Sequence, residues 1–135
     1  VVVENDMFYG RADVVTPNCV YDIKTVHSNS FWYAQKKDYD IKKEKRHNWL
    51  QLACYGSILN KEKLCLLQIS KDDLTIAENW DFTKNWANEL QYEVEQLKLY
   101  DTSEDLPPAI PTFKNECEKY CLWFNRCKEI EQEKK

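Results

Sequence analysis

The chain has 135 residues, a net charge of −4 and an apolar fraction of 43% that includes five tryptophans. This size and composition fit a single compact domain with a modest core, and the mild acidity excludes a protein held on nucleic acid by its overall charge. No apolar run is long enough to span a membrane, and no segment has the pattern of a signal peptide.

The first predicted elements are strands joined by a tight turn. Residues 1–5 are predicted as a strand, and residues 8–15 and 19–26 are β-branched and aromatic runs typical of strands. Thr16, Pro17 and Asn18 separate the two longer runs, and the proline presets a turn. The sequence therefore predicts an antiparallel hairpin.

This hairpin carries two carboxylates and a lysine. Across the turn Asp13 is expected close to Asp22, and two neighbouring carboxylates repel each other unless they share a cation or a proton. Mg²⁺ or Mn²⁺ would resolve that repulsion. Lys24 shares a strand face with Asp22, so it would face a phosphoryl oxygen or the attacking water. For Asp22 and Lys24 alone, an ordinary solvated strand face is the alternative.

A basic segment rich in aromatic residues follows the hairpin. Phe31, Trp32, Tyr33 and Tyr39 are interleaved with or precede its cations, which are Lys36, Lys37, Lys42, Lys43, Lys45 and Arg46. Such a segment suits phosphate contacts and base stacking. A solvated helix whose aromatic side chains cover the core is the alternative. Its position beside Lys24 favours DNA binding.

The remaining elements are predicted from periodicity. Residues 47–56 have a helical pattern that places Gln51 and Tyr55 on one face of the helix. The alternative is an ordinary helix surface on which the two polar side chains are hydrogen-bonded but have no function. Residues 63–70 and 74–82 are predicted strands. A further helix is expected from an N-cap at Thr83 to about Tyr100.

The end of the chain has a different composition. Three prolines within residues 101–112 predict an extended linker. In residues 113–135, three thiols stand close together at Cys117, Cys121 and Cys127, and a short charged segment offers little core to bury them. Disulfides suit an intracellular enzyme poorly, which favours a metal. The other cysteines, Cys19, Cys54 and Cys65, are expected as buried small side chains.

Three motifs occur in order: G-x-x-D ending at Asp13, D-x-K from Asp22 to Lys24, and Q-x-x-x-Y from Gln51 to Tyr55. In this order, and in a strand–strand–helix context, they resemble the RecB-like branch of the PD-(D/E)XK nuclease superfamily. That branch includes AddB-type helicase-nucleases, CRISPR-adaptation exonucleases and phage recombination exonucleases. The resemblance covers about residues 1–100 and implies an α/β fold: a restriction-endonuclease-like core with a central mixed β-sheet flanked by helices, followed by a cysteine-bearing helical segment.

The resemblance also implies roles for single residues. Asp13 and Asp22 would be metal ligands together with the backbone carbonyl of Ile23, and Lys24 would be the catalytic lysine. Gln51 and Tyr55 would position the substrate and the catalytic groups. The implied activity is metal-dependent hydrolysis of DNA, expected to be exonucleolytic, in recombination, repair or phage DNA processing. The expected location is the cytoplasm of a bacterium or of a phage-infected cell.

Two parts of the family pattern are incomplete in this sequence. Family members begin with a helix that carries a glutamate or histidine metal ligand, whereas residues 1–5 are predicted as strand, so we expect a piece of a longer protein. Glu4 and His27 are weak substitutes for that ligand. Some relatives hold a [4Fe–4S] cluster with three C-terminal cysteines and one upstream, and Cys117, Cys121 and Cys127 resemble that group with an altered C-x3-C-x5-C spacing. Zinc and free thiols are the alternatives.

The expected partners are DNA, single-stranded or at duplex ends, and a helicase or recombination protein, with no membrane. Two other functions stay open. The chain could be an inactive nuclease-like module that grips DNA or assembles with a helicase. Alternatively, the cysteines form a zinc-stabilised interaction domain and the hairpin charges are ordinary surface.

Overall fold

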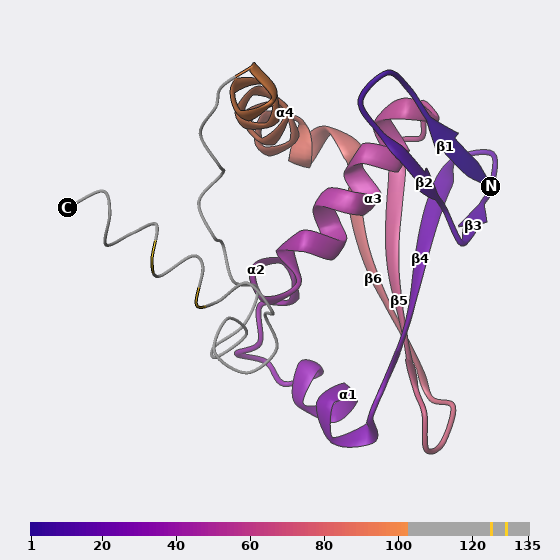
Figure 1. Ribbon diagram of the computed structural model, residues 1–135. Helices are drawn as coiled ribbons and strands as arrows, with labels where there is room; N and C mark the ends of the chain where they lie inside the picture. Colours follow the sequence, from indigo (N-terminus) through magenta and orange to yellow (C-terminus); the bar gives the residue numbers. More distant parts are fainter. Residues whose placement is uncertain (103–124, 126–128, 130–135) are drawn as a thin grey trace. The chain divides into compact units, whose positions relative to one another are not determined.

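The computed structural model describes residues 1–102 together with Asn125 and Glu129. The chain divides into two compact units, Val1–Gln96 and Leu97–Lys135. The sheet and the three sequence motifs that end at Tyr55 belong to the first unit (Figure 1). No helix among the described residues has the length and apolar character needed to cross a membrane.

The elements follow one another in an order of strands, helices, strands and helices. They are β1 (Val2–Glu4), β2 (Tyr9–Arg11), β3 (Val14–Val15), β4 (Cys19–Val26), α1 (Ser28–Ala34), α2 (Ile41–Glu44), α3 (Arg46–Ile58), β5 (Lys63–Ser70), β6 (Ile76–Phe82), the 3₁₀ turn η1 (Thr83–Trp86) and α4 (Ala87–Thr102).

Four strands form the main sheet in the order β3-β4-β5-β6. The outer pairs, β3 with β4 and β5 with β6, are antiparallel, whereas β4 and β5 are parallel. The parallel pair requires a crossover, which the helices between β4 and β5 provide. Helix α3 lies along β4 and β5, and α1 contacts β5 (Figure 1). The predicted central mixed sheet with flanking helices is therefore confirmed, and it fits a restriction-endonuclease-like core.

The predicted strand over residues 8–15 is wrong as one continuous element. It breaks at Ala12 and Asp13 into β2, which pairs with β1 in a separate two-stranded sheet, and β3, which pairs with β4. Ala12 is buried and exchanges backbone hydrogen bonds with Val1, while the carboxylate of Asp13 turns toward β4. These long-range bonds override the local strand pattern.

The predicted N-cap at Thr83 is also wrong. Its hydroxyl donates to the carbonyl of Lys61, and a 3₁₀ turn precedes α4. Thr83 thereby fastens the end of β6 to the loop before β5, instead of satisfying an amide at the start of a helix.

The core lies between α3 and one face of the sheet. Trp49 of α3 is fully buried and stacks on Trp86 with ring centroids 5.9 Å apart. Gly56 lets α3 approach β5 closely, since a Cβ there would stand 2.8 Å from Leu64. The thiols expected to be buried are indeed buried and free: Cys19, Cys54 and Cys65.

A buried carboxylate ties β6 to the helices around it. Asp81 accepts hydrogen bonds from Asn85 at 2.6 Å and from the indole of Trp86 at 2.9 Å, and it pairs with Lys42 of α2 at 2.8 Å. Burial alone would raise the pKa of Asp81, but the hydrogen bonds from Lys42, Asn85, Trp86 and the Phe82 amide outweigh it and hold the pKa below its usual value.

We therefore expect Asp81→Ala to cost about 2 kcal/mol or more of unfolding free energy, because three donors, among them the buried Trp86 indole, lose their acceptor. Because the folded pKa is lowered, the Asp81 contribution is complete above the carboxyl pKa of the unfolded chain. It is lost as the pH falls through the lower folded value. Urea unfolding at several pH values measures both effects. Parallel stability–pH curves for Asp81→Asn and the wild type would contradict this assignment.

Candidate functional site

The site forms directly before β3 begins, where the edge of β4 is no longer paired. The last antiparallel pairs are Val15 with Val20 and Val14 with Tyr21, so Asp13 stands opposite Asp22 with no strand bonds between them. In place of a backbone partner, the Oδ2 atom of Asp13 accepts the amide of Ile23 at 2.7 Å. The expectation that Asp13 lies beside Asp22 is confirmed.

This hydrogen bond also fixes the direction of the Ile23 carbonyl. In a β-strand the N–H and C=O of one residue point toward the same neighbouring strand. Because the N–H of Ile23 reaches Asp13, its carbonyl faces the same open edge. Asp13 uses only one carboxylate oxygen in that bond, which leaves Oδ1 available at the edge.

Asp22 is buried and incompletely satisfied. Only 4% of the residue is exposed; its Oδ1 accepts Lys24 Nζ at 2.9 Å, and its Oδ2 is fully buried without a hydrogen-bond partner. Burial raises the pKa of the Asp22 carboxyl, and the nearby charge of Asp13 raises it further. The interactions with Lys24, and more weakly with Asn48, oppose that rise.

These donors fit a hard divalent cation. The orphaned Asp22 Oδ2, the second oxygen of Asp13 and the carbonyl of Ile23 are the oxygen ligands that Mg²⁺ and Mn²⁺ prefer. Within the described residues no group of three or more histidine, cysteine or acidic side chains could hold a metal. Glu4 and His27 therefore do not join Asp13 and Asp22 in such a group.

The helix motif also reaches this hairpin. Gln51 Nε2 donates to the Tyr55 hydroxyl at 2.9 Å, and the Tyr55 ring lies against Gly10 of β2. A Cβ at Gly10 would stand 2.5 Å from the Tyr55 oxygen, so only glycine permits this approach. The glycine of G-x-x-D and the tyrosine of Q-x-x-x-Y are thus in contact. Gln51 itself is exposed.

Asn48 is a site residue that the sequence analysis missed. It is buried in the first turns of α3 and approaches the Asp22 carboxylate closely enough to lower its pKa. Asn48, Gln51 and Tyr55 are spaced i, i+3 and i+7, so they follow one stripe of the helix. That spacing was the available signal, since it extends the Q-x-x-x-Y stripe by one turn.

The basic segment is divided among several contacts. Lys42 pairs with Asp81, and Arg46 binds Glu89 at 3.0 Å and Glu93 at 2.9 Å. Lys36 lies 4.7 Å from the centre of the Tyr33 ring. DNA binding by this segment and by its other members, Lys37, Lys43 and Lys45, stays a prediction.

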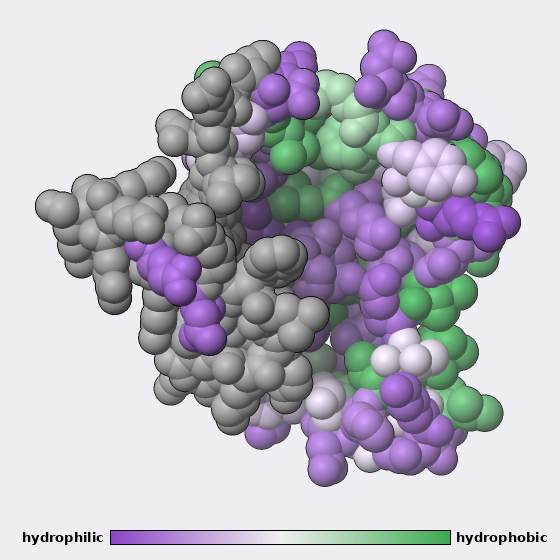
Figure 2. All heavy atoms as spheres, viewed as in Figure 1, coloured by the Kyte–Doolittle hydropathy of each residue, from purple (hydrophilic) through white to green (hydrophobic). Residues whose placement is uncertain are grey.

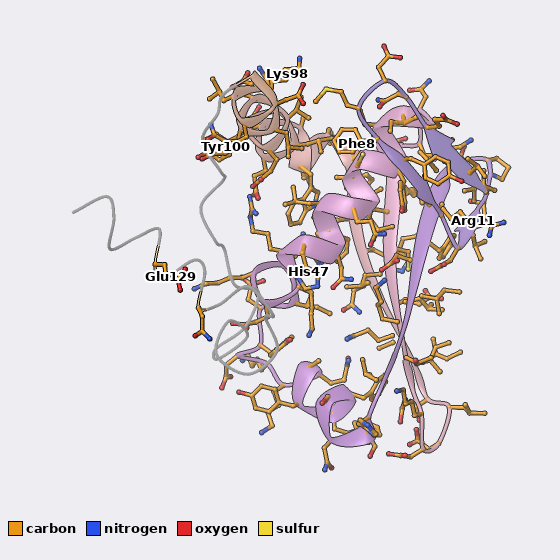
Figure 3. The ribbon with its side chains drawn as sticks, viewed as in Figure 1. Phe8, Arg11, His47, Lys98, Tyr100 and Glu129 are labelled. Carbon is orange, nitrogen blue, oxygen red and sulfur yellow. The ribbon has the colours of Figure 1, made fainter. Side chains whose placement is uncertain are left out.

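Hydrophilic residues occupy the middle of the space-filling view, between α3 and β4 (Figure 2). Figure 3 shows His47 on the first turn of α3 and Arg11 directed away from the sheet. Both are exposed.

Cys117, Cys121 and Cys127 lie outside the described residues, so an iron–sulfur or zinc site there stays a prediction.

No protein-family model and no curated protein matches this chain. Two solved structures resemble it. The alkaline exonuclease LHK-Exo from Laribacter hongkongensis is 11% identical, with a TM-score of 0.45 over 74% of this chain and 59% of that one. The protein SSO0001 is 26% identical, with a TM-score of 0.48 over 88% of this chain and 50% of that one. The chain thus spans about half to three fifths of these two, and neither likeness identifies its family.

The contact between Gly10 and Tyr55 predicts a coupled mutational effect. Gly10→Ala should cost about 1–3 kcal/mol of unfolding free energy, because the new methyl group displaces a tyrosine packed into the core. Tyr55→Phe removes the closest clashing atom, so the same substitution should cost less in that background. Urea unfolding of the two single variants and the double variant measures this coupling. Additive costs would show that Gly10 does not contact Tyr55 in solution.

Proposed function

We propose that this chain is a divalent-metal-dependent nuclease that hydrolyses phosphodiester bonds of DNA. The observation that supports this most is the buried Asp22 Oδ2, which has no hydrogen-bond partner and stands beside a second carboxylate at an open strand edge. A buried carboxylate oxygen is costly when unpaired. Such an oxygen is retained in a fold where a ligand binds to it, and in this proposal the ligand is a metal ion.

Asp13, Asp22 and the Ile23 carbonyl would hold the metal. The bound ion would act as a Lewis acid at the scissile phosphate and assist attack by water. This role agrees with the chemistry of the three oxygen donors and with the raised pKa of the buried Asp22 carboxyl, which an added positive charge would lower.

Besides the proposed metal ion, the Lys24 side chain brings a positive charge to this site. Its ammonium lies 2.9 Å from Asp22 Oδ1, and its side chain is 39% exposed, so it is open to a ligand at the site. From there it would stabilise negative charge that develops on the phosphate during hydrolysis. Asn48 approaches Asp22 from α3 and lowers its pKa, and the hydrogen-bonded Gln51 and Tyr55 pack α3 against β2.

The finer points of this function are also part of the proposal. The expected action is exonucleolytic, on single strands or duplex ends, in recombination, repair or phage DNA processing, with a helicase or recombination protein as partner. Exposed aromatic residues on α1, Trp32 and Tyr33, suit contact with unpaired bases. An inactive DNA-binding module is the alternative, favoured by the small number of side-chain ligands within the described part of the chain.

A nuclease assay with Mn²⁺ tests the proposal on the protein and on any longer chain that contains it. Asp22→Asn and Lys24→Ala should each lower hydrolysis of labelled single-stranded and duplex oligonucleotides by about 100-fold or more. Lys63→Ala is the matched control, because Lys63 is an exposed lysine at the start of the neighbouring strand. Equal rates for wild type, Asp22→Asn and Lys24→Ala would refute the assignment. DNA binding without hydrolysis would favour the inactive module.

Metal binding is testable without turnover. In EDTA, Asp22→Asn should unfold at the same temperature as the wild type or higher, because it removes a buried charge whose pKa is raised in the folded state. Saturating Mn²⁺ should raise the melting temperature of the wild type by several degrees, as about 2.7 kcal/mol is gained at a hundredfold excess over Kd. The variant should gain little. Equal shifts would place the metal elsewhere.

A further inference from the structure

The sheet face toward α3 changes character along the strands. Near the start of β4 it is apolar, with Val20 beside Leu64. Further along, Lys24 stands beside Gln68 on β5, and Gln68 is only 2% exposed. Buried side-chain amides are rare unless they are hydrogen-bonded, so we expect the Gln68 amide to have hydrogen-bond partners on this half of the sheet face.

The orientation of the Gln68 amide follows from its neighbour on β6. The Nδ2 atom of Asn79 donates to the backbone carbonyl of Leu66 at 3.2 Å, which fixes the Asn79 amide because a carbonyl only accepts. The same Nδ2 lies 3.5 Å from Oε1 of Gln68. The oxygen of Gln68 therefore faces β6, and its Nε2 points away from β6.

On that other side lies β4, where the directly paired residue is Lys24. Adjacent strands are about 4.8 Å apart, so the Gln68 amide and the lysine stem are neighbours. Both Nε2 and the ammonium only donate hydrogen bonds. Among the described residues Lys24 has Asp22 as its acceptor, whereas the contact of Gln68 with Asn79 is made by its oxygen and leaves Nε2 directed away from Asn79.

Two donors that stand side by side without sharing a protein acceptor suit an anionic oxygen. We propose that Gln68 is a substrate-binding residue of this site, whose Nε2 donates to a non-bridging phosphate oxygen alongside Lys24. This inference rests on the proposed function and extends the phosphate contacts from β4 to β5. In so buried a place a hydrogen bond to a charged group is strong.

Two substitutions separate this role from a structural one. Gln68→Leu removes the amide at nearly constant volume. Gln68→Glu keeps an oxygen for Asn79 but replaces the donor that faces Lys24. If Nε2 binds phosphate, both should lower kcat/KM about 10- to 100-fold, and both should weaken binding of a fluorescent oligonucleotide measured with Ca²⁺ in place of Mn²⁺. Ser70→Ala is the control, since Ser70 is buried on the same face of β5 and its hydroxyl has no partner.

The outcomes are distinct. A purely structural Gln68 predicts that Gln68→Leu lowers the melting temperature while the folded variant retains wild-type oligonucleotide affinity and turnover, and that result would overturn the inference. So would unchanged oligonucleotide affinity in both variants, whatever the nuclease assay shows. If both variants are impaired, combining Gln68→Leu with Lys24→Ala should cost less than the two separate losses predict, because the two donors share one phosphate. If Asp22→Asn and Lys24→Ala are fully active, the proposed function itself fails.

Discussion

The site depends on one hydrogen bond, from the Ile23 amide to the Asp13 carboxylate. The Asp13 side chain takes the place that a backbone carbonyl would have occupied if β3 had begun before Val14. Three features follow from this substitution. The strand edge stays open, the Ile23 carbonyl faces it, and two carboxylates are brought together with spare oxygen atoms. Continued pairing of β3 with β4 would have consumed that carbonyl and closed the edge to ligands.

Two buried aspartates on neighbouring parts of the same fold illustrate how environment separates structural from functional carboxylates. Asp81 is surrounded by donors and its pKa is lowered, so its charge stabilises the fold. Asp22 is equally buried, but one oxygen has no partner and its pKa is raised. The two residues are of the same type, but only Asp22 has a buried oxygen that a cation could still bind. The fold thus keeps a local instability at Asp22, which the proposed metal ion would relieve.

Local patterns were enough to predict the hairpin, the helix with Gln51 and Tyr55, and the two later strands, because hydrophobic periodicity and a proline turn act over short distances. The proximity of Asp13 and Asp22 followed from the same turn. The break inside residues 8–15 could not be predicted, since it depends on hydrogen bonds to Val1 and to Ile23. The pairing of Lys42 with Asp81 likewise joins segments far apart in the sequence. Contacts of this kind are set by tertiary packing, for which a single sequence carries little signal.

The charges at the site explain how a mildly acidic chain could act on DNA. Asp13 and Asp22 outweigh Lys24, so the group without a metal is net negative when both carboxylates are ionised, and it would repel a phosphate. A divalent cation reverses that sign, and the site then attracts a phosphodiester of single negative charge. The salt bridge of Lys24 to Asp22 uses only Oδ1 and leaves Oδ2 for the ion, so lysine and metal need not compete for the same oxygen. In the proposed function, attraction for DNA at this site would therefore be conditional on the metal, whereas the overall charge of −4 opposes binding elsewhere.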